Sequence, residues 1–162
     1  MQYAIRRARP EECSDAERVA RAAFRDYEAG HGDWYRKLTE AQPMRVLGET
    51  AEILIAVSGE NVVGAVGYMA PGIQRHDFFP PEWAILRMLS VPPEHRGHGI
   101  GRALVKACID CARRDKAGTL GLYTSPVMKT AVPLYLAMGF VHLRKLPAED
   151  DVPCDLYALE VG

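Results

Sequence analysis

The sequence has few of the features that mark secreted, membrane-bound or nucleic-acid-binding proteins. Its N-terminal residues lack the hydrophobic stretch of a signal peptide, and no apolar run approaches the roughly 20 residues that span a bilayer. The formal net charge of -1, with no cationic tail, provides no overall field that would attract nucleic acid or a membrane surface. We therefore expect a cytoplasmic protein that binds neither nucleic acid nor membranes.

Cysteine is also scarce, with four residues in the chain. A chain of 162 residues can bury a core without disulfides, and in a reducing compartment it does not need them. Cys108 and Cys111 have C-x-x-C spacing, but they share one helical face with apolar residues and no second ligand pair has zinc spacing. We therefore interpret them as buried small side chains and expect no metal site.

What the chain does contain is the composition of an ordinary globular domain. Hydrophobic residues make up 48% of it and charged residues 25%, a balance that argues against disorder. It contains no internal repeat and no low-complexity tract. The length suits a single domain over residues 1–162.

Hydrophobic periodicity and turn residues predict an α/β chain with the element order β-α-α-β-β-β-α-β-α-β-β. The strand at Trp83–Val91, the helix at Ile100–Arg114 and the strand at Thr119–Thr124 form a crossover, so these two strands should be parallel. We expect a mixed sheet with helices on both faces. The other expected strands are Tyr3–Arg7, Ala51–Val57, Val62–Met69, Val141–Leu146 and Asp155–Glu160. Three further helices are expected: one begins at Pro10, one covers Trp34–Leu38 and is interrupted at Pro43, and one covers Thr130–Met138.

The segment Arg96–Arg102 carries the clearest chemical signal. A strand leads into Gly97, Gly99 and Gly101, and a helix follows. Glycine lets backbone amides approach a ligand closely, and the first amides of a helix lack internal acceptors and carry the positive end of its dipole. Together with the two flanking arginines, they predict an anion site that suits a pyrophosphate, although a tight strand-to-helix turn without a ligand is the plainer alternative.

Two other phosphate-binding loops do not fit this segment. A P-loop ends in Gly-Lys-Ser/Thr, whereas Gly101 is followed here by Arg102-Ala103. The Gly-x-Gly-x-x-Gly fingerprint of dinucleotide-binding proteins fails as well, because the third glycine comes one residue early and the next strand ends in Tyr123-Thr124 without an acid for the ribose.

Three motifs in order resemble the GNAT N-acetyltransferase superfamily. Arg96-Gly97-His98-Gly99-Ile100-Gly101 is similar to its pyrophosphate loop, and Leu86–Val91 is similar to the strand before that loop. Ala131–Phe140 resembles the family's Ala-x-x-Leu-Tyr-x-x-x-Gly-Phe motif. The resemblance implies a mostly antiparallel sheet of six to seven strands with one parallel pair, and an acetyl-CoA-dependent N-acetyltransferase that uses no metal.

The resemblance also assigns residues to the site. In the family, the strand before the loop splays from its parallel neighbour and pantetheine lies in the gap. Tyr135 matches the general acid that protonates the leaving thiolate, a role that suits a phenol because its reference pKa of about 10 is near that of a thiol. The implied cofactor contacts are Leu89, Ser90, Val91, Arg96, Gly97, His98, Gly99, Ile100, Gly101 and Arg102.

Some positions depart from the family pattern or have a second interpretation. Ile85 stands where many members have a glutamate that can act as the general base. The candidate base is therefore Glu82 or His76, and either would be reached through a chain of water molecules. Met128 replaces an asparagine that often contacts the cofactor. Tyr135 shares a helical face with apolar residues, so a role in the core alone is the alternative.

The acceptor is the least determined part of the prediction. The resemblance implies a primary amine of a small molecule or a peptide, attacked directly in a ternary complex, and it admits a homodimer. A catalytically weak acyl-CoA-binding sensor is the alternative function. The residues Trp34, Tyr35, His76, Asp77, Phe78 and Phe79 lie in segments that border the acceptor in family members, where they either recognise an amine or pack loop against helix.

Overall fold

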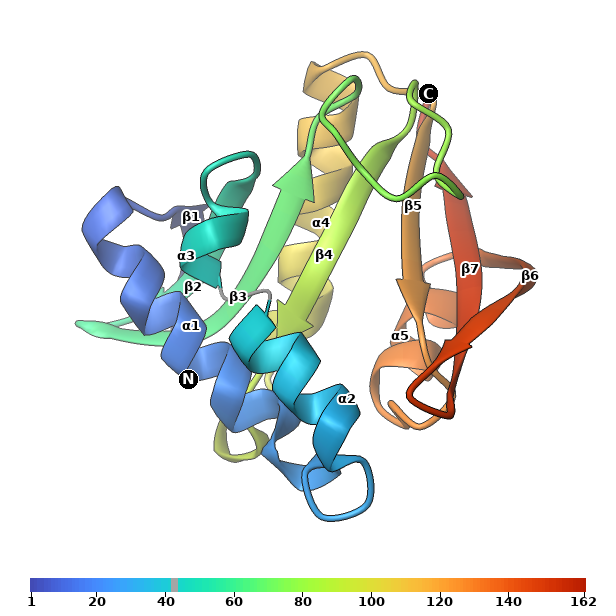
Figure 1. Cartoon of the computed structure of the whole chain (residues 1–162). Coiled ribbons are helices and arrows are strands. Elements are labelled where there is room, and N and C mark those ends of the chain that lie inside the picture. Colours follow the sequence, from blue (N-terminus) through green and yellow to red (C-terminus); the bar gives the residue numbers. More distant parts are fainter. Residues whose placement is uncertain (42–43) are drawn as a thin grey trace.

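Seven strands form one sheet in the order β1-β2-β3-β4-β5-β7-β6 in the computed structural model, which describes residues 1–41 and 44–162 (Figure 1). The strands are β1 (Ala4–Arg7), β2 (Glu52–Ser58), β3 (Asn61–Met69), β4 (Ala84–Ser90), β5 (Thr119–Thr124), β6 (Val141–Glu149) and β7 (Val152–Glu160). The helices are α1 (Cys13–Phe24), α2 (Gly32–Arg36), α3 (Met44–Leu47), α4 (Ile100–Arg114) and α5 (Ala131–Ala137), and α2 continues into η3 (Lys37–Ala41). The pair β4–β5 is parallel and the other pairs are antiparallel, so the predicted fold class is confirmed.

The two halves of the chain differ in how well their elements were predicted. The bounds of α4 and β5 are those expected from the sequence, whereas α3 was missed and the predicted break at Pro43 lies outside the described residues. The hairpin β6–β7 is longer than predicted, because a two-residue turn at Asp150-Asp151 lets β6 run to Glu149 and β7 begin at Val152. The sequence alone predicts that the first strand ends at Leu146 and that the second begins at Asp155.

Alternation along β2 explains why helices cover both faces of the sheet. Ile53 and Ile55 belong to the core cluster that contains α1, whereas Leu54 and Ala56 belong to the cluster that contains α4. Successive side chains of a strand point to opposite faces, so the run Ile53–Val57, which is apolar at every position, needs cover on both sides. Figure 1 accordingly shows α1 in front of the sheet and α4 behind it.

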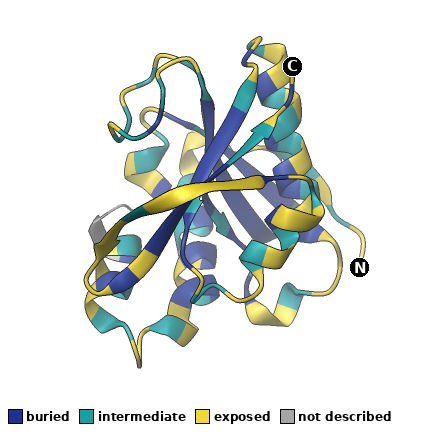
Figure 2. Cartoon of the chain, turned by 90° about the vertical axis from the view of Figure 1, so that its right-hand side faces the viewer, coloured by how far each residue is buried: buried dark blue, intermediate teal, exposed yellow. Residues whose placement is uncertain are grey.

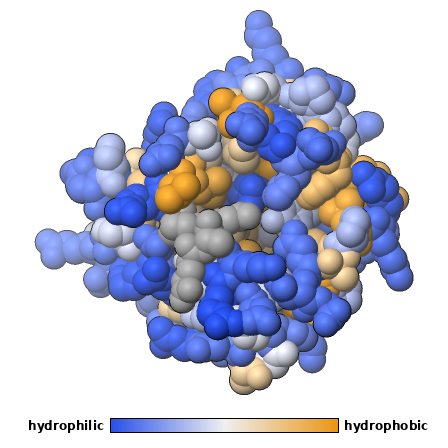
Figure 3. All heavy atoms as spheres, viewed as in Figure 1, coloured by the Kyte–Doolittle hydropathy of each residue, from blue (hydrophilic) through white to orange (hydrophobic). Residues whose placement is uncertain are grey.

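The edge of the sheet at β6 is open to solvent. Eight of its nine residues are exposed, and Figure 2 shows it as a nearly continuous exposed strand. Arg144, Lys145 and Pro147 on this strand are residue types that discourage further strand pairing at a sheet edge. On the face shown in Figure 3, hydrophobic side chains form separate patches within a mostly hydrophilic surface.

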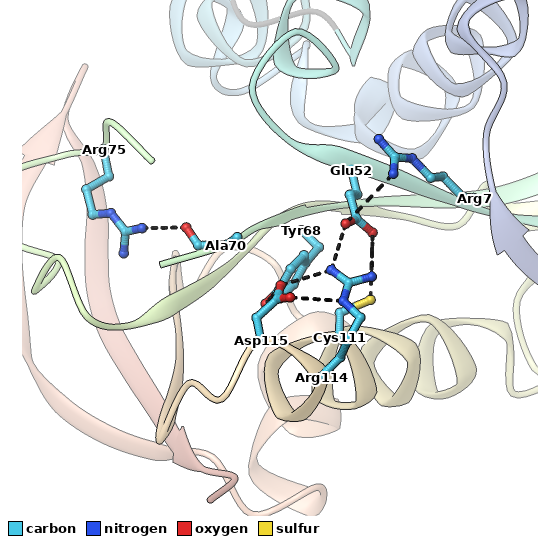
Figure 4. A network of polar contacts seen from close by, with 8 residues as sticks. All are labelled: Arg7, Glu52, Tyr68, Ala70, Arg75, Cys111, Arg114 and Asp115. Carbon is cyan, nitrogen blue, oxygen red and sulfur yellow. Dashed lines mark hydrogen bonds and ion pairs between the residues drawn. The ribbon is translucent and has the colours of Figure 1, made fainter. Parts of the chain in front are cut away.

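A polar network fixes the C-terminal end of α4 against the sheet (Figure 4). Arg114 Nη2 donates to Glu52 Oε1 of β2 at 2.7 Å and to Asp115 Oδ2 at 2.9 Å, and the hydroxyl of Tyr68 on β3 donates to the same Asp115 oxygen at 2.8 Å. Burial, together with the hydrogen bond to Asp115, raises the pKa of Tyr68, and Arg114 lowers the pKa of Asp115. The network therefore keeps Tyr68 protonated and the carboxyl group charged, and it holds the helix whose other end carries the glycine loop.

None of the helices in the described residues is long and apolar enough to cross a membrane. The cysteines of α4 behave as predicted, since Cys108 is fully buried and Cys111 is half-buried on the face that packs against the sheet. In the part of the chain that the structure describes, no group of three or more histidine, cysteine and acidic side chains could hold a metal ion.

Gly64 sets how closely α4 approaches β3, and this gives a test of the packing. A Cβ atom at Gly64 would lie 2.7 Å from Cγ2 of Ile100 and 3.1 Å from Cδ1 of Leu104. We expect Gly64→Ala to lower the free energy of unfolding by about 1–3 kcal/mol, because overpacking forces the helix or its side chains to shift. Denaturant titration measures the change, and Gly118→Ala, where a Cβ atom meets nothing within 4 Å, is the control. Equal stability of the two variants would contradict this account of the packing.

Candidate functional site

A cavity opens where β4 and β5 separate. The two strands pair in parallel at Ala84–Leu120 and Ile85–Gly121, at the start of each strand. Beyond this point a cavity of about 390 Å³ is lined by Leu86–Leu89 of β4 and by Tyr123 and Thr124 of β5. The remaining wall comes from α1, α2, η3, the glycine loop, α5 and the β6–β7 hairpin. The splayed pair that the sequence analysis expected is therefore present.

A bulge turns β4 at this cavity. The register between β3 and β4 shifts between Ala65–Ser90 and Gly67–Arg87, so two residues of β4, Met88 and Leu89, face one residue of β3. Met88 has φ of 58°, a left-handed conformation that is uncommon outside glycine, asparagine and aspartate. A bulge leaves one residue outside the ladder, and here its backbone amide becomes available to a bound group.

The glycine loop lies at one end of the cavity and begins α4. Gly97 has φ of 84° and Gly99 has φ of 77°, so both adopt the left-handed conformation that glycine permits without steric cost. Gly99 precedes the first residue of α4, and its carbonyl accepts from the amide of Ala103 at 3.0 Å. The amides before Ala103 are the ones that a helix leaves without internal acceptors, so the loop has the backbone geometry of an anion site.

Arg96 has a structural function beside its charge. Its Nε donates to the carbonyl of Val91 at 2.9 Å and its Nη2 donates to the carbonyl of Ala23 at 3.2 Å. The side chain thus ties the loop to the end of β4 and to α1 while its positive charge lines the cavity. Tyr3 adds a second tie, because its hydroxyl donates to the carbonyl of His98 at 3.0 Å.

The structure brings most of the predicted site residues together at this cavity. The residues that line it as expected are Leu89, Val91, Arg96, Gly97, Gly99, Ile100, Gly101, Arg102 and Tyr135. Ser90 points away: it is buried, and its hydroxyl donates to the carbonyl of Met88 at 2.8 Å. The side chain of His98 is exposed and lies outside the lining. The bulge and the loop decide these orientations, and the sequence motif does not show them.

Tyr135 packs in the core and also reaches the cavity, so its surroundings agree with either role that the sequence left open. Its side chain is 4% exposed and its ring centroid lies 5.6 Å from that of Phe140, as in a core aromatic. The residue also lines the cavity, and burial raises the pKa of its phenol. Pro133 is in the first turn of α5, where proline is tolerated, and Thr130 occupies the N-cap position without making a capping hydrogen bond.

Glu82 lies outside the cavity, and its role as a base reached through a chain of water stays a prediction. Glu82 is exposed before the start of β4, outside the cavity lining, and its charge acts on Arg75. The carboxylate that does line the cavity is Glu149 at the end of β6, and Cys154 of β7 lies there too. Sequence reasoning missed both, because the β6–β7 hairpin meets the cavity only through the folding of the sheet. Burial, with the charge of Glu149, raises the pKa of Cys154 to about 11.

The loop before β4 supports one wall of the cavity through Tyr123. The guanidinium of Arg75 donates to four backbone carbonyls, those of Ala70, Ile73, Pro80 and Trp83, at 2.5–3.1 Å. Figure 4 shows the bond to Ala70. Within this loop, the rings of His76 and Phe78 are stacked with their centroids 5.0 Å apart. Each of the two rings also packs edge-on against Tyr123, with a centroid distance of 5.4 Å.

The other candidates for the acceptor site divide between the cavity and the core. Trp34 lines the cavity together with Tyr27, which meets it edge-on at 5.6 Å. Tyr35 and Phe79 pack in core clusters. Burial and the charge of Arg87 lower the pKa of His76, so this imidazole is neutral at neutral pH.

The site agrees with the result of comparing the chain with known proteins. The model of the acetyltransferase (GNAT) family matches residues 16–140. The chain belongs to the GNAT family. N-acetyltransferase 8B of Rattus norvegicus is 37% identical over 91 residues, a match that covers 53% of this chain and 37% of that protein. The chain thus spans well under half the length of the curated relatives that it matches.

Solved GNAT structures share the whole fold of the chain. An N-acetyltransferase from Staphylococcus aureus Mu50 superposes with a TM-score of 0.76 at 15% identity, over 100% of both chains. The PaiA N-acetyltransferase of Thermoplasma acidophilum, solved in complex with coenzyme A, superposes with a TM-score of 0.75 at 16% identity, over 99% of both chains. At these identities the likeness confirms the GNAT fold.

The conformation of Gly97 provides a test of the anion site in this GNAT domain. A Cβ atom there meets nothing within 4 Å, and the same is true of Gly59 in the β2–β3 turn, where φ is 61°. Alanine should destabilise the fold at either position by about 1–2 kcal/mol, because a side chain disfavours the left-handed conformation. We expect Gly97→Ala alone to raise the dissociation constant for coenzyme A tenfold or more in calorimetry. If Gly59→Ala weakens binding equally, the loop is not the anion site.

Proposed function

We propose that this domain is an acetyl-CoA-dependent N-acetyltransferase that passes acetyl to a primary amine of a small molecule or a peptide. The observation that carries the proposal is the junction of the glycine loop and the β4 bulge in one cavity. The loop supplies backbone amides and positive charge for a pyrophosphate, and the bulge supplies an amide beside the place where the strands part. The family membership supports acetyl transfer in general.

The donor would lie along β4 with its pyrophosphate at the loop. The amides from Gly97 to Arg102 and the charges of Arg96 and Arg102 suit a doubly charged diphosphate. Beyond Ile85, β4 is free of pairing with β5, so the backbone of Leu89 and Val91 can pair with the amide-containing pantetheine chain. The two prolines that follow Val91 remove backbone donors, and they would end this pairing.

The transfer needs an activated carbonyl and a proton for the leaving group. The amides at the β4 bulge would donate hydrogen bonds to the carbonyl oxygen and stabilise the negative charge that develops on it as the amine attacks, as an oxyanion site does. The carbon–sulfur bond then breaks as Tyr135 would give its phenolic proton to the departing thiolate, and the proton that the amine nitrogen loses would restore the phenol. Because burial raises the pKa of Tyr135, this proton is present at neutral pH.

Direct attack by the amine fits the cavity better than a covalent enzyme intermediate. Cys154 is the cysteine that lines the described part of the cavity, and its pKa of about 11 keeps it a thiol at neutral pH. A thiolate is the nucleophile in such chemistry, so a neutral buried thiol is a poor one.

Two measurements test the proposal. Calorimetry with coenzyme A should show binding, and acetyl-CoA with a panel of primary amines, amino acids and short peptides should show thiol release above the rate of each component alone. Absence of binding removes the function altogether. Binding without thiol release for any amine would instead favour the second candidate, a catalytically weak acyl-CoA sensor, for which the replacement of the strand glutamate by Ile85 is the supporting observation.

Replacing Tyr135 by phenylalanine separates catalysis from packing. The variant keeps the ring against Phe140 and removes the proton donor, so we expect kcat to fall by about 10²–10⁴-fold while the dissociation constant for coenzyme A stays within twofold. Stopped-flow or steady-state thiol release measures kcat, and calorimetry measures affinity. An unchanged kcat would remove Tyr135 from the mechanism and leave it as a core residue.

Replacing Cys154 tests direct transfer. We expect Cys154→Ala to retain kcat within about threefold, since the thiol takes no part in bond making and its pKa of about 11 leaves it uncharged. Mass spectrometry of the wild-type protein after incubation with acetyl-CoA alone should show no acetylated cysteine. A large loss of kcat together with an acetylated Cys154 would indicate a covalent route.

A further inference from the structure

Glu149 lies at a rigid point of the β6–β7 hairpin. It pairs with Val152 across a two-residue turn, in which Asp150 has φ of 48° and Asp151 has φ of 64°. Positive φ at both central residues is the geometry of a type I′ turn, which fixes the register of the two strands. The turn therefore fixes where the backbone of Glu149 stands at the mouth of the cavity.

The hairpin tip is tied across the cavity to η3. Lys37 Nζ lies 3.0 Å from the carboxylate of Asp150, joining segments that are 113 residues apart in the chain. Trp34 and Leu38, which are close to Lys37 in sequence, line the cavity, and so does Glu149. The apolar side chains of α2 and η3 and the carboxylate of Glu149 thus line the same cavity.

Glu149 acts on the groups around this end of the cavity. Its charge contributes to raising the pKa of Tyr123 on β5 and of Cys154 on β7, and it opposes the lowering of the pKa of His76. Arg87 of β4 is the nearby cation, with its guanidinium carbon 5.5 Å from the centre of the Tyr123 ring. The side chain of Glu149 is exposed at the mouth, so a proton that it receives can pass to solvent.

From this arrangement we propose that Glu149 binds the ammonium group of the acceptor and takes its proton, and that the acceptor is a primary monoamine with an apolar or aromatic body. The inference rests on the proposed function. The proton leaves the ammonium nitrogen for the carboxylate, and the neutral amine that remains is the nucleophile. The neutral amine is required because an ammonium group has no lone pair to attack a carbonyl.

Charge and polarity of the lining select the acceptor class. Among the lining residues that the structure describes, Glu149 carries the only carboxylate. A polyamine or an aminoglycoside brings several ammonium groups, and the described lining offers them this single carboxylate. Tyr27, Trp34 and Leu38 instead offer apolar surface to the body of a monoamine.

The test compares amines and two neighbouring acids. Phenethylamine is the monoamine, and spermidine and kanamycin are the polycations. Glu149→Gln removes the charge and basicity at nearly constant shape. Asp151→Asn removes an equal charge from the same turn, outside the cavity lining, and asparagine tolerates positive φ. Thiol release gives kcat/KM for each amine, and calorimetry gives coenzyme A affinity.

We expect wild-type kcat/KM to be at least tenfold higher for phenethylamine than for either polycation. For Glu149→Gln we expect a loss of about 10²-fold or more at pH 7, with coenzyme A affinity unchanged and Asp151→Asn within twofold of wild type. The loss should shrink as the pH approaches about 10, where a primary amine reaches the enzyme already neutral.

Other results overturn the inference or the function beneath it. If Glu149→Gln keeps wild-type kcat/KM, or if its loss is the same at every pH, the carboxylate is not the proton acceptor. If the polycations are the better substrates, the acceptor class is wrong, and the proposed acetyltransferase function stands in both cases. If wild type binds no coenzyme A, or releases no thiol with any amine, the proposed function itself fails and this inference falls with it.

Discussion

The site depends on one constraint: β4 and β5 must meet at one end and part at the other. At the paired end, Gly121 lets Trp83 pack directly over β5, since a Cβ atom there would lie 2.5 Å from the Trp83 ring. At the other end, the bulge at Met88 turns β4 out of register with β3. A flat, fully paired strand would leave no room for a donor, so close packing at one end and local strain at the other produce the cavity.

Arginine side chains hold in place the segments that form or support this cavity. Arg96 ties the glycine loop to Val91 and Ala23. Arg75 donates hydrogen bonds to four carbonyls of the loop before β4. Arg114 joins the end of α4 to Glu52 and Asp115. Arginine suits these tasks because its planar group offers several donors in fixed directions. A site that is held in place before its ligands arrive loses less entropy on binding them, and preorganised donors favour charge that develops during acyl transfer.

The two ends of the cavity are built from different kinds of structure. The donor end uses backbone geometry that is local in sequence, namely the bulge, the glycine loop and the first turn of α4. The end that we propose for the acceptor is assembled from α2, η3, β5 and the β6–β7 hairpin, and the Lys37–Asp150 ion pair joins η3 to the tip of the hairpin. Under the proposed function, this division would let one part of the chain hold the donor while distant segments shape the acceptor side, as loops on a rigid scaffold commonly do.

The sequence by itself determined the features that depend on neighbours along the chain. The alternating residues of β2, the apolar face of α4 and the glycines of the loop each follow from short-range spacing, and the motifs around them placed Tyr135 and the loop residues at one site. Only the tertiary structure decided that Ser90 faces the core and that Arg96 donates hydrogen bonds to backbone carbonyls. It also decided that Glu149 and Cys154 reach the cavity, whereas Glu82 does not. The reason is range: a spacing of two to four residues fixes which face a side chain takes, but contacts between segments more than 100 residues apart arise from the packing of the whole sheet.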